Sequence, residues 1–336
     1  MFENISIIGD GAMGTVLAML LCGKRDSVKS VRMWGYDGEQ LKQIEKSGEN
    51  KKFLPGYKLP DGLVFEADDE CIMAGADLII SAVPCQFMRG IWKRLKDYVP
   101  QGVPIVSVAK GIENDTLLCP TQILAEILSL GQNGKLVVLS GPTIADELAR
   151  KLPATACAAS GDEQLARDVQ QTFNTSWFRI YTNTDILGVE LAGAMKNIIA
   201  IAAGIIDGIG AGDNAKAALL SRGLTEITRL GIACGARPQT FAGLTGLGDL
   251  VTTCISPKGR NRSFGERIGK GQSAEQARRA TESVIEGVDT CKSVVALAER
   301  HNVEMPITEA VYQVLFESKP VKKAIADLMK RRLKAE

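Results

Sequence analysis

Histidine is almost absent from this sequence: His301 is the only one among 336 residues. Sites built from several histidines are therefore excluded, and a Ser-His-Asp triad would have to use His301. We expect the chemistry of the chain to use Lys, Asp, Glu or backbone dipoles. Net charge is low as well, because 40 Lys and Arg residues oppose 39 Asp and Glu residues. Proteins that bind nucleic acid by neutralising phosphates usually have a basic excess, so we expect no nucleic-acid partner.

Closely spaced cysteines and long apolar runs are also lacking. The eight cysteines form no Cys-x-x-Cys pair, so zinc ribbons and thioredoxin motifs are not predicted, and we expect no metal site. The N-terminal residues lack the features of a signal peptide. The most apolar stretch, residues 191–206, contains a Lys and an Asn and is shorter than the roughly 20 residues of a membrane span. We expect a cytoplasmic protein without stable membrane insertion.

Short apolar runs alternate with helical patterns in the first half of the chain. Most runs are continuously apolar, which is typical of strands covered on both faces. Alternating strands and helices predict an α/β fold with a doubly wound, parallel, Rossmann-like sheet. The predicted strands are residues 5–8, 31–34, 64–66, 77–83, 104–108 and 135–139.

The pattern becomes almost entirely helical from Thr184 onwards. This change predicts two domains, a number that also suits the chain length. We expect a dinucleotide-binding Rossmann-like domain in residues 1–185 and an all-helical substrate domain in residues 186–336, with the ligand site between them.

A glycine-rich turn follows the first predicted strand. Gly9, Gly11 and Gly14 form a G-x-G-x-x-G pattern that opens a predicted helix. The first glycine permits a tight turn, the second lets backbone approach a pyrophosphate, and the third lets helix and strand pack closely. The helix N-terminus favours an anion. The motif predicts a dinucleotide cofactor, NAD or NADP.

Asp37 follows the second predicted strand, where an acidic residue can hold a ribose 2′-hydroxyl. It can equally be a turn residue within the segment from Gly35 to Gly38, and the sequence leaves both interpretations open.

Polar residues also follow two later strands. Lys110 comes just after one apolar run, and Gly141 and Thr143 come just after another. Ligands of open α/β sheets collect beyond the carboxyl ends of the strands, so these residues are candidates for the site. Lys110 could instead be a solvated loop lysine, and Thr143 could cap the following helix.

Lys196 lies in a strongly apolar helical pattern. Small residues share its helix face, whereas larger apolar residues lie opposite. This face leaves room for another chain or a small ligand, and a buried lysine can exchange a proton near neutral pH. The alternative is a structural lysine in a buried ion pair against a neighbouring helix. The small residues are Ala192, Gly193, Ala200, Ala203 and Gly204.

Residues 243–254 form a predicted glycine-dense loop that ends with an acid and hydroxyls. No strand pattern precedes this loop, so a second nucleotide site is not predicted. We expect Asp249 to pair with a buried lysine, whose charge needs a nearby anion. A helix N-cap is the alternative role for Asp249.

A basic cluster at residues 258–263 precedes a predicted helix. The guanidinium of Arg260, together with nearby N–H donors, suits a phosphate. A solvated basic turn is the alternative.

Seven segments, taken in order, resemble those of bacterial glycerol-3-phosphate dehydrogenases that use NAD(P). The similarity extends over essentially the whole chain, through MPITEAVYQVLF near its end. The segments are GDGAMGT, SVAKGIE, SGPTIADEL, AGAMKNIIAIAAGIIDG, LTGLGDLVTTC, GRNR and VIEG.

The resemblance implies an enzyme that interconverts sn-glycerol 3-phosphate and dihydroxyacetone phosphate by hydride transfer with NAD or NADP. It implies a small phosphorylated substrate, a homodimer and a role in supplying glycerol 3-phosphate for phospholipid synthesis. Lys196 is implied to be the proton donor and acceptor at the substrate C2 oxygen. The implied substrate contacts are Lys110, Gly141, Thr143, Lys196, Asp249, Gly259, Arg260 and Asn261. Besides the three glycines, the implied cofactor contacts are Ala12, Met13, Tyr36, Lys110, Ala145, Arg260, Val284 and Glu286.

The chain departs from the family pattern at two places. Ala12 and Met13 replace a pair that is often Ser-Tyr or Ala-Trp, so a hydroxyl contact to the pyrophosphate and an aromatic surface are lost. Tyr36 stands where some members carry a basic or histidine residue that could meet a 2′-phosphate. This second departure argues against a strict NADP preference.

Two other functions are compatible with part of the pattern. A ketopantoate reductase-like enzyme also uses a helix lysine, but it would not require the basic cluster or a phosphorylated substrate. A non-catalytic dinucleotide sensor would bind cofactor without turnover, and it gives no reason for Lys196 on a small-residue face.

Overall fold

The computed structural model describes residues 2–131, 134–281 and 284–333, and these residues divide into two compact units. Within the described residues, the first unit comprises the chain up to Lys110 together with residues 119–189. The second comprises residues 111–118 and the chain from Glu190 onwards. The short segment 111–118 thus belongs to the second unit although it lies between two parts of the first.

The first unit contains one sheet of eight strands, counted over the described residues. Their order across the sheet is β3-β2-β1-β4-β5-β6-β7-β8, and the first six all run parallel. The strands are β1 (Asn4–Ile8), β2 (Ser30–Trp34), β3 (Leu63–Phe65), β4 (Leu78–Ser81), β5 (Ile105–Ser107), β6 (Leu136–Ser140), β7 (Ala154–Ala159) and β8 (Phe178–Asn183).

This order confirms the predicted α/β class and Rossmann-like arrangement. The strands are added on one side of β1 up to β3 and then on its other side from β4 onwards. All six predicted strands are present, each within two residues of its predicted ends. The prediction missed β7 and β8. The prediction that all strands run parallel was also wrong, because β7 pairs with β6 in the antiparallel sense. The sequence of β7, ATACAA, is rich in Ala, and a strand of this composition has little local signal.

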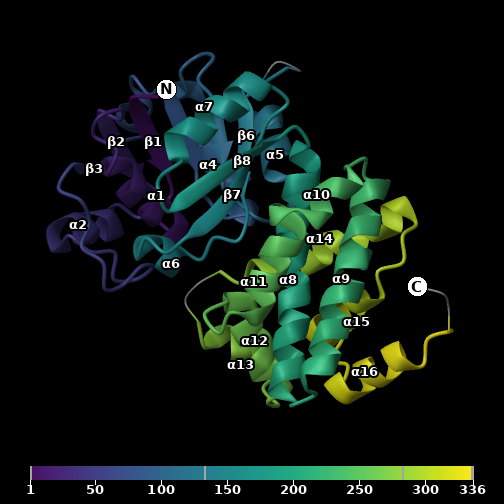
Figure 1. Cartoon of the computed structure of the whole chain (residues 1–336). Helices are drawn as coiled ribbons and strands as arrows, with labels where there is room; N and C mark the ends of the chain where they lie inside the picture. The colour runs from purple at the N-terminus through teal and green to yellow at the C-terminus, as the bar shows by residue number, and fades with distance from the viewer. Residues whose placement is uncertain (1, 132–133, 282–283, 334–336) are drawn as a thin grey trace. The chain divides into compact units, whose positions relative to one another are not determined.

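Helices pack against the sheet of the first unit, as Figure 1 shows. They form because apolar residues recur along one side and because several begin with an aspartate cap; Asp162, for example, accepts two backbone N–H bonds at the start of α7. The helices are α1 (Ala12–Cys22), α2 (Gly38–Ser47), α3 (Asp69–Met73), α4 (Cys85–Leu95), the short η1 (Lys96–Tyr98), α5 (Pro120–Ile127), α6 (Ala145–Ala149) and α7 (Glu163–Phe173).

The core of the first unit consists of strand residues that are buried on both faces of the sheet. Ile7, Ile80 and Val106 come from three adjacent central strands, and each is completely buried. Burial of one such side chain contributes about 1.5–3 kcal/mol to folding. This core holds the carboxyl ends of the central strands in fixed positions, where the candidate residues follow.

The second unit is helical over the described residues. It contains most of α8 (Ile186–Gly208), which begins in the first unit, together with α9 (Asp213–Ala233), α10 (Pro238–Ala242), the π-helical turn η2 (Leu244–Gly248), α11 (Asp249–Ile255), α12 (Arg260–Gly269), α13 (Ala274–Arg279), α14 (Glu286–His301), α15 (Pro306–Phe316) and α16 (Val321–Met329).

Helix α8 runs through the second unit beside α9 and α12 (Figure 1). Glycines permit this packing: a Cβ on Gly204 would lie 1.9 Å from the carbonyl oxygen of Arg262, and one on Gly265 would lie 2.0 Å from that of Ile201. The backbones of α8 and α12 are therefore in direct contact. Any side chain at these positions would force the helices apart.

By length and composition, α8 could cross a membrane, and it is the one helix among the described residues that passes this test. Our expectation that the apolar stretch is too short was wrong, because the helix extends to 23 residues. However, 94% of its most apolar window is buried inside the fold. A helix that is apolar all round and packed on several sides is typical of a protein core.

A buried carboxylate joins α9 to α15. The two carboxylate oxygens of Glu226 accept hydrogen bonds from Ile307 N–H (2.9 Å) and Thr308 N–H (2.8 Å), the first unpaired amides of α15. The hydroxyl of Thr308 donates a third bond at 2.8 Å. Burial raises the pKa of Glu226, and these hydrogen bonds lower it. The carboxylate thus caps a buried helix N-terminus that would otherwise lack acceptors.

We predict that Glu226→Ala lowers the free energy of unfolding by about 2–3 kcal/mol, because buried backbone donors lose their acceptors. Chemical denaturation followed by circular dichroism measures the change. Glu309→Ala is the matched control, because Glu309 is exposed in the first turn of α15. It should change stability by less than about 1 kcal/mol. Equal effects of the two substitutions would contradict the capping role.

Candidate active site

Candidate residues of the first unit lie beyond the carboxyl ends of its parallel strands. β1 and β4 flank the point at which the strand order reverses. Gly9 directly follows β1, Lys110 follows β5, and Gly141 directly follows β6. Ligands of open α/β sheets bind at this edge, so the structure brings these candidates to the expected place.

Each of the three glycines of the turn is required for a different physical reason. Gly9 has φ +118, and a Cβ there would lie 2.8 Å from the carbonyl oxygen of Ala82. A Cβ on Gly14 would lie 2.1 Å from the carbonyl oxygen of Gly9, so this glycine permits close packing of α1 on the turn. A Cβ on Gly11 would meet nothing within 4 Å. The open space beside Gly11, at the N-terminus of α1, is the room a pyrophosphate needs.

Ala12 and Met13 are the first two residues of α1, so their backbone N–H groups lie in its first turn. Asp37 is the N-cap of α2 and accepts hydrogen bonds from Glu39 N–H (3.0 Å) and Gln40 N–H (3.2 Å). Of the two interpretations of Asp37, the turn role is the one these contacts support. The side chain of Tyr36 is 72% exposed and therefore accessible to a ligand.

Lys110, Gly141 and Thr143 meet at one carbonyl group. The ammonium of Lys110 donates to the carbonyl oxygen of Gly141 (3.0 Å), and the hydroxyl of Thr143 donates to the same oxygen (3.1 Å). Gly141 has φ +146, and a Cβ there would lie 2.9 Å from the Cα of Ala156. The close approach of β7 thus explains this glycine. The N-cap of α6 is Ile144, so the suggested capping role of Thr143 was wrong.

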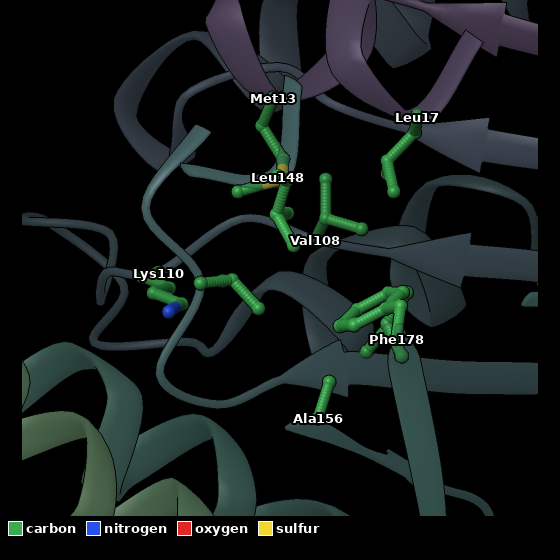
Figure 2. Close-up of a pocket in the computed structure, with 9 residues that line it drawn as sticks. Met13, Leu17, Val108, Lys110, Leu148, Ala156 and Phe178 are labelled. Atoms are coloured by element: carbon green, nitrogen blue, oxygen red, sulfur yellow. The ribbon is translucent and has the colours of Figure 1, made fainter. Parts of the chain in front are cut away.

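A small, mostly apolar pocket lies next to these residues (Figure 2). Met13, Lys110 and Thr143 take part in its lining, so residues predicted from separate motifs share one pocket. Figure 2 shows Lys110 on one side of the view and Leu17 and Phe178 on the other. Ala145, the first residue of α6, follows Thr143 closely in the chain.

Candidate residues of the second unit centre on Lys196. Its ammonium donates to a carboxylate oxygen of Asp249 at 2.6 Å and to the hydroxyl of Thr253. The side chains of Lys196 and Asp249 are only 6% and 2% exposed. The predicted pairing of Asp249 with a buried lysine is confirmed. Breaking such a pair from one side leaves an uncompensated buried charge, which costs about 3–5 kcal/mol.

Thr253 was not predicted to contact Lys196. It lies four residues after Asp249 on α11, and its hydroxyl is 3.3 Å from the carboxylate of Asp249. Residues at this spacing share a helix face, which is the signal that could have identified it.

At one end of α8, the small-residue face lies against a neighbouring helix, which is one of the alternatives that the sequence left open. Around Gly204 the space is filled by the backbone of α12, because a Cβ there would collide with Arg262. Ala200 and Ala203 are completely buried. At this end of α8 the small residues allow α12 to approach, so of the two predicted occupants the structure places a protein segment and not a ligand there.

The glycine-dense segment before Asp249 was predicted as a loop but forms the π-helical turn η2. A Cβ on Gly246 would lie 2.0 Å from the carbonyl oxygen of Phe241, so glycine permits this wide turn to pack on α10. Asp249 is the first residue of α11, and the N-cap of that helix is Gly248. The alternative of Asp249 as a helix N-cap is therefore excluded. π-helical turns occur frequently at functional sites.

Asn261 joins three helices through its buried side chain. Its amide nitrogen donates to the side-chain oxygen of Asn197 on α8 (3.0 Å), and its own oxygen accepts from Gly287 N–H at the start of α14 (3.0 Å). Both polar atoms of the amide are therefore engaged within the protein. As the second residue of α12, Asn261 also presents its backbone N–H to a ligand.

Arg260 is exposed at the first position of α12, directly after the N-cap Gly259. Its guanidinium donates to the carbonyl oxygen of Val284 at 3.2 Å, just before α14 begins at Glu286. The first turn of α12 therefore combines a guanidinium with helix N–H groups. This combination is suited to a phosphate.

Cys254 is adjacent to Thr253 but does not have the properties of a reactive thiol. It is completely buried, and burial raises its pKa to about 12, although the charge of Lys196 acts in the opposite direction. A neutral buried thiol is a weak nucleophile. Among the described residues, no group of three or more His, Cys, Asp and Glu side chains is placed to hold a metal ion.

Family models match the chain over almost its whole length. The model of the NAD-dependent glycerol-3-phosphate dehydrogenase N-terminus matches residues 4–166, and that of the C-terminus matches residues 185–326. The chain belongs to the NAD-dependent glycerol-3-phosphate dehydrogenase family. The resemblance noted in the sequence is confirmed.

Curated members of the family align from end to end with this chain. The glycerol-3-phosphate dehydrogenase (NAD(P)+) of Chlorobium phaeobacteroides strain BS1 is 48% identical over 333 residues, which are 99% of each chain. The protein of the same name from Geobacter sp. strain M21 is 47% identical and covers 100% of this chain and 99% of its own length.

Solved structures give the same result. The crystal structure of glycerol-3-phosphate dehydrogenase from Coxiella burnetii superposes with a TM-score of 0.92 at 36% identity, covering 98% of this chain and 99% of that one. A ketopantoate reductase-family structure from Ralstonia eutropha has a TM-score of 0.60 at 14% identity. This second likeness shows a common fold only.

Proposed function

We propose that this chain interconverts sn-glycerol 3-phosphate and dihydroxyacetone phosphate with NAD or NADP as the hydride carrier. The observation that carries the proposal is the buried Lys196 ammonium, held by Asp249 and Thr253, in a member of the glycerol-3-phosphate dehydrogenase family. A lysine held at a fixed position is suited to deliver a proton to a carbonyl oxygen and to take it back.

The turn after β1 fits a dinucleotide. Gly11 leaves open space at the N-terminus of α1, where N–H groups and the helix dipole favour a pyrophosphate. Gly9, Gly14, Ala12 and Met13 form the rest of this cradle. A bound nicotinamide supplies or accepts a hydride. Tyr36, Lys110 and Ala145 in the first unit, and Arg260, Val284 and Glu286 in the second, are further proposed cofactor contacts, and these rest on the family resemblance.

Lys196 has two functions in this proposal. Its ammonium donates a proton to the C2 oxygen as dihydroxyacetone phosphate is reduced, and its positive charge stabilises negative charge that develops on that oxygen. Asp249 offsets the cost of burying the ammonium, and Thr253 accepts a hydrogen bond from it. In the oxidation direction Lys196 accepts the proton from the C2 hydroxyl.

The substrate phosphate is bound by the first turn of α12 and by Arg260. Because Asn261 is the second residue of α12, we propose that it contributes its backbone N–H. Binding of a group remote from C2 contributes orientation to the reaction. Lys110, Gly141, Thr143 and Gly259 complete the proposed set of substrate contacts.

We further propose a division of roles in which residues 1–185 provide most of the cofactor contacts and residues 186–336 provide most of the substrate contacts. We also propose that the enzyme is a cytoplasmic homodimer that acts without membrane insertion and without nucleic acid. Its product, glycerol 3-phosphate, would be used for phospholipid synthesis. The resemblance to the family supports these statements.

The test of this function is oxidation of NADH and NADPH, followed separately by absorbance, with dihydroxyacetone phosphate as substrate and dihydroxyacetone as the control. Turnover that requires the phosphate is expected. A folded protein that binds NADH but turns over neither substrate would contradict the proposal and favour a dinucleotide sensor. Turnover of a 2-oxo acid without phosphate would favour a ketopantoate reductase-like activity.

Removal of the amine should abolish proton transfer but not cofactor binding. We predict that Lys196→Ala lowers kcat at least about 100-fold, while the Kd for NADH measured by calorimetry stays within about twofold of wild type, because the glycine turn lies in the first unit. Lys270→Ala, at the exposed lysine that forms the C-cap of α12, is the control.

Because Lys196→Ala leaves Asp249 buried without its partner, the double variant Lys196→Met/Asp249→Asn should show the same loss of kcat with less loss of stability. Full activity in either variant would remove Lys196 from its proposed role.

The phosphate anchor is tested by a change of substrate preference. We predict that Arg260→Ala raises the KM for dihydroxyacetone phosphate about ten- to hundredfold, the effect of losing a hydrogen bond to a charged group. The kcat/KM for dihydroxyacetone should change much less. Arg267→Ala, an exposed arginine in the last turn of the same helix, should change neither. An equal loss on both substrates would contradict the anchor assignment.

A further inference from the structure

Asn50 is a completely buried polar residue that belongs to none of the motifs described above. It lies between α2 and β3, in a segment whose neighbours Lys51 and Lys52 are exposed. A buried amide needs partners for its donors and its acceptor, and here one of those partners is a carbonyl group of the glycine turn.

The amide of Asn50 contacts two backbone groups and one side chain. Its nitrogen donates to the carbonyl oxygen of Asp10 (2.7 Å) and to the hydroxyl of Thr15 on α1 (2.8 Å). Its oxygen accepts from Phe53 N–H (3.2 Å), which folds the segment around the amide. The Thr15 hydroxyl donates to the same Asp10 carbonyl at 3.3 Å. The Asp10 carbonyl is thus held by two donors.

Through the peptide bond between Asp10 and Gly11, this contact also fixes the direction of the Gly11 N–H in the glycine turn. This bond is trans, so the Asp10 C=O and the Gly11 N–H point to opposite sides of the chain. While Asn50 holds the carbonyl on the inner side, the N–H faces away from it. Gly11 is also the glycine of the motif beside which space is open.

Without Asn50, the peptide could rotate more freely because glycine adopts many conformations. The carbonyl oxygen could then face the position of the pyrophosphate, where its partial negative charge is unfavourable. The amide of Asn50 prevents this rotation.

We propose that Asn50 is a positioning residue for the cofactor, which orients the Gly11 N–H toward the pyrophosphate by holding the Asp10 carbonyl. The inference rests on the proposed function only in requiring that the turn binds a dinucleotide. The side chain of Asn50 does not itself touch the ligand.

The experiment compares Asn50→Ala and Asn50→Asp with wild type. Aspartate keeps the size and the acceptor for Phe53 N–H but replaces the donor with an oxygen that faces the Asp10 carbonyl. Calorimetry with NADH and with ADP-ribose should show a Kd raised about ten- to hundredfold for both variants. At saturating NADH, the KM for dihydroxyacetone phosphate should stay unchanged.

Ser160→Ala is the matched control. Ser160 is also a buried polar residue of the first unit, and its hydroxyl donates to a backbone carbonyl, that of Leu136, at 2.9 Å. This variant should lose a similar amount of thermal stability while its Kd for NADH stays that of wild type. If Asn50→Ala does not fold, Asn50→Asp carries the test.

Wild-type Kd values in both folded Asn50 variants would overturn the inference, as would failure of both variants to fold. Neither result would affect the proposed reaction, which depends on turnover by wild type. Conversely, wild-type protein that binds NADH without turning over dihydroxyacetone phosphate would contradict the proposed function and leave the test of Asn50 intact.

Discussion

The ion pair between Lys196 and Asp249 is the interaction on which the arrangement of the helical unit depends. Two charges removed from water cost several kcal/mol each, and their attraction offsets this cost only when the geometry is held closely. The ammonium and the carboxylate come from α8 and α11, which are separated by more than fifty residues of chain. The packing of these helices must therefore be accurate to a fraction of an ångström.

Direct backbone contact fixes the position of α8 against the neighbouring helix α12. Gly204 on α8 and Gly265 on α12 let the two helices meet without intervening side chains, and Asn261 links α12 to both α8 and α14. Side chains can change rotamer, but a contact between two backbones has little freedom to adjust. The same use of glycine recurs at Gly14 in the first unit, where α1 packs on the turn that precedes it.

The sequence was sufficient where local pattern determines structure. The six parallel strands were found because each is a continuous apolar run, and the Lys196–Asp249 pair was found because a buried charge needs a partner. β7 was missed because alanines give it no pattern, and its antiparallel direction depends on how it pairs with the preceding strand β6. The small residues around Gly204 fit equally well a ligand space or a helix contact, and only the position of α12 decides between them. The partners of Asn50 and Asn261 likewise depend on elements far apart in the chain.

The π-helical turn η2 adds one residue per turn to the winding that an α-helix would have. The chain before it must pack Gly246 against the backbone of Phe241, while the chain after it must present Asp249 to α8. Ordinary α-helical winding across residues 244–248 would change the rotation between these two contacts by about 100°. The number of residues in this segment therefore sets the rotation of α11 relative to α10, so the length of the segment matters as much as its composition. A deletion of one residue here would be more damaging than many substitutions, because it would change the direction in which Asp249 points.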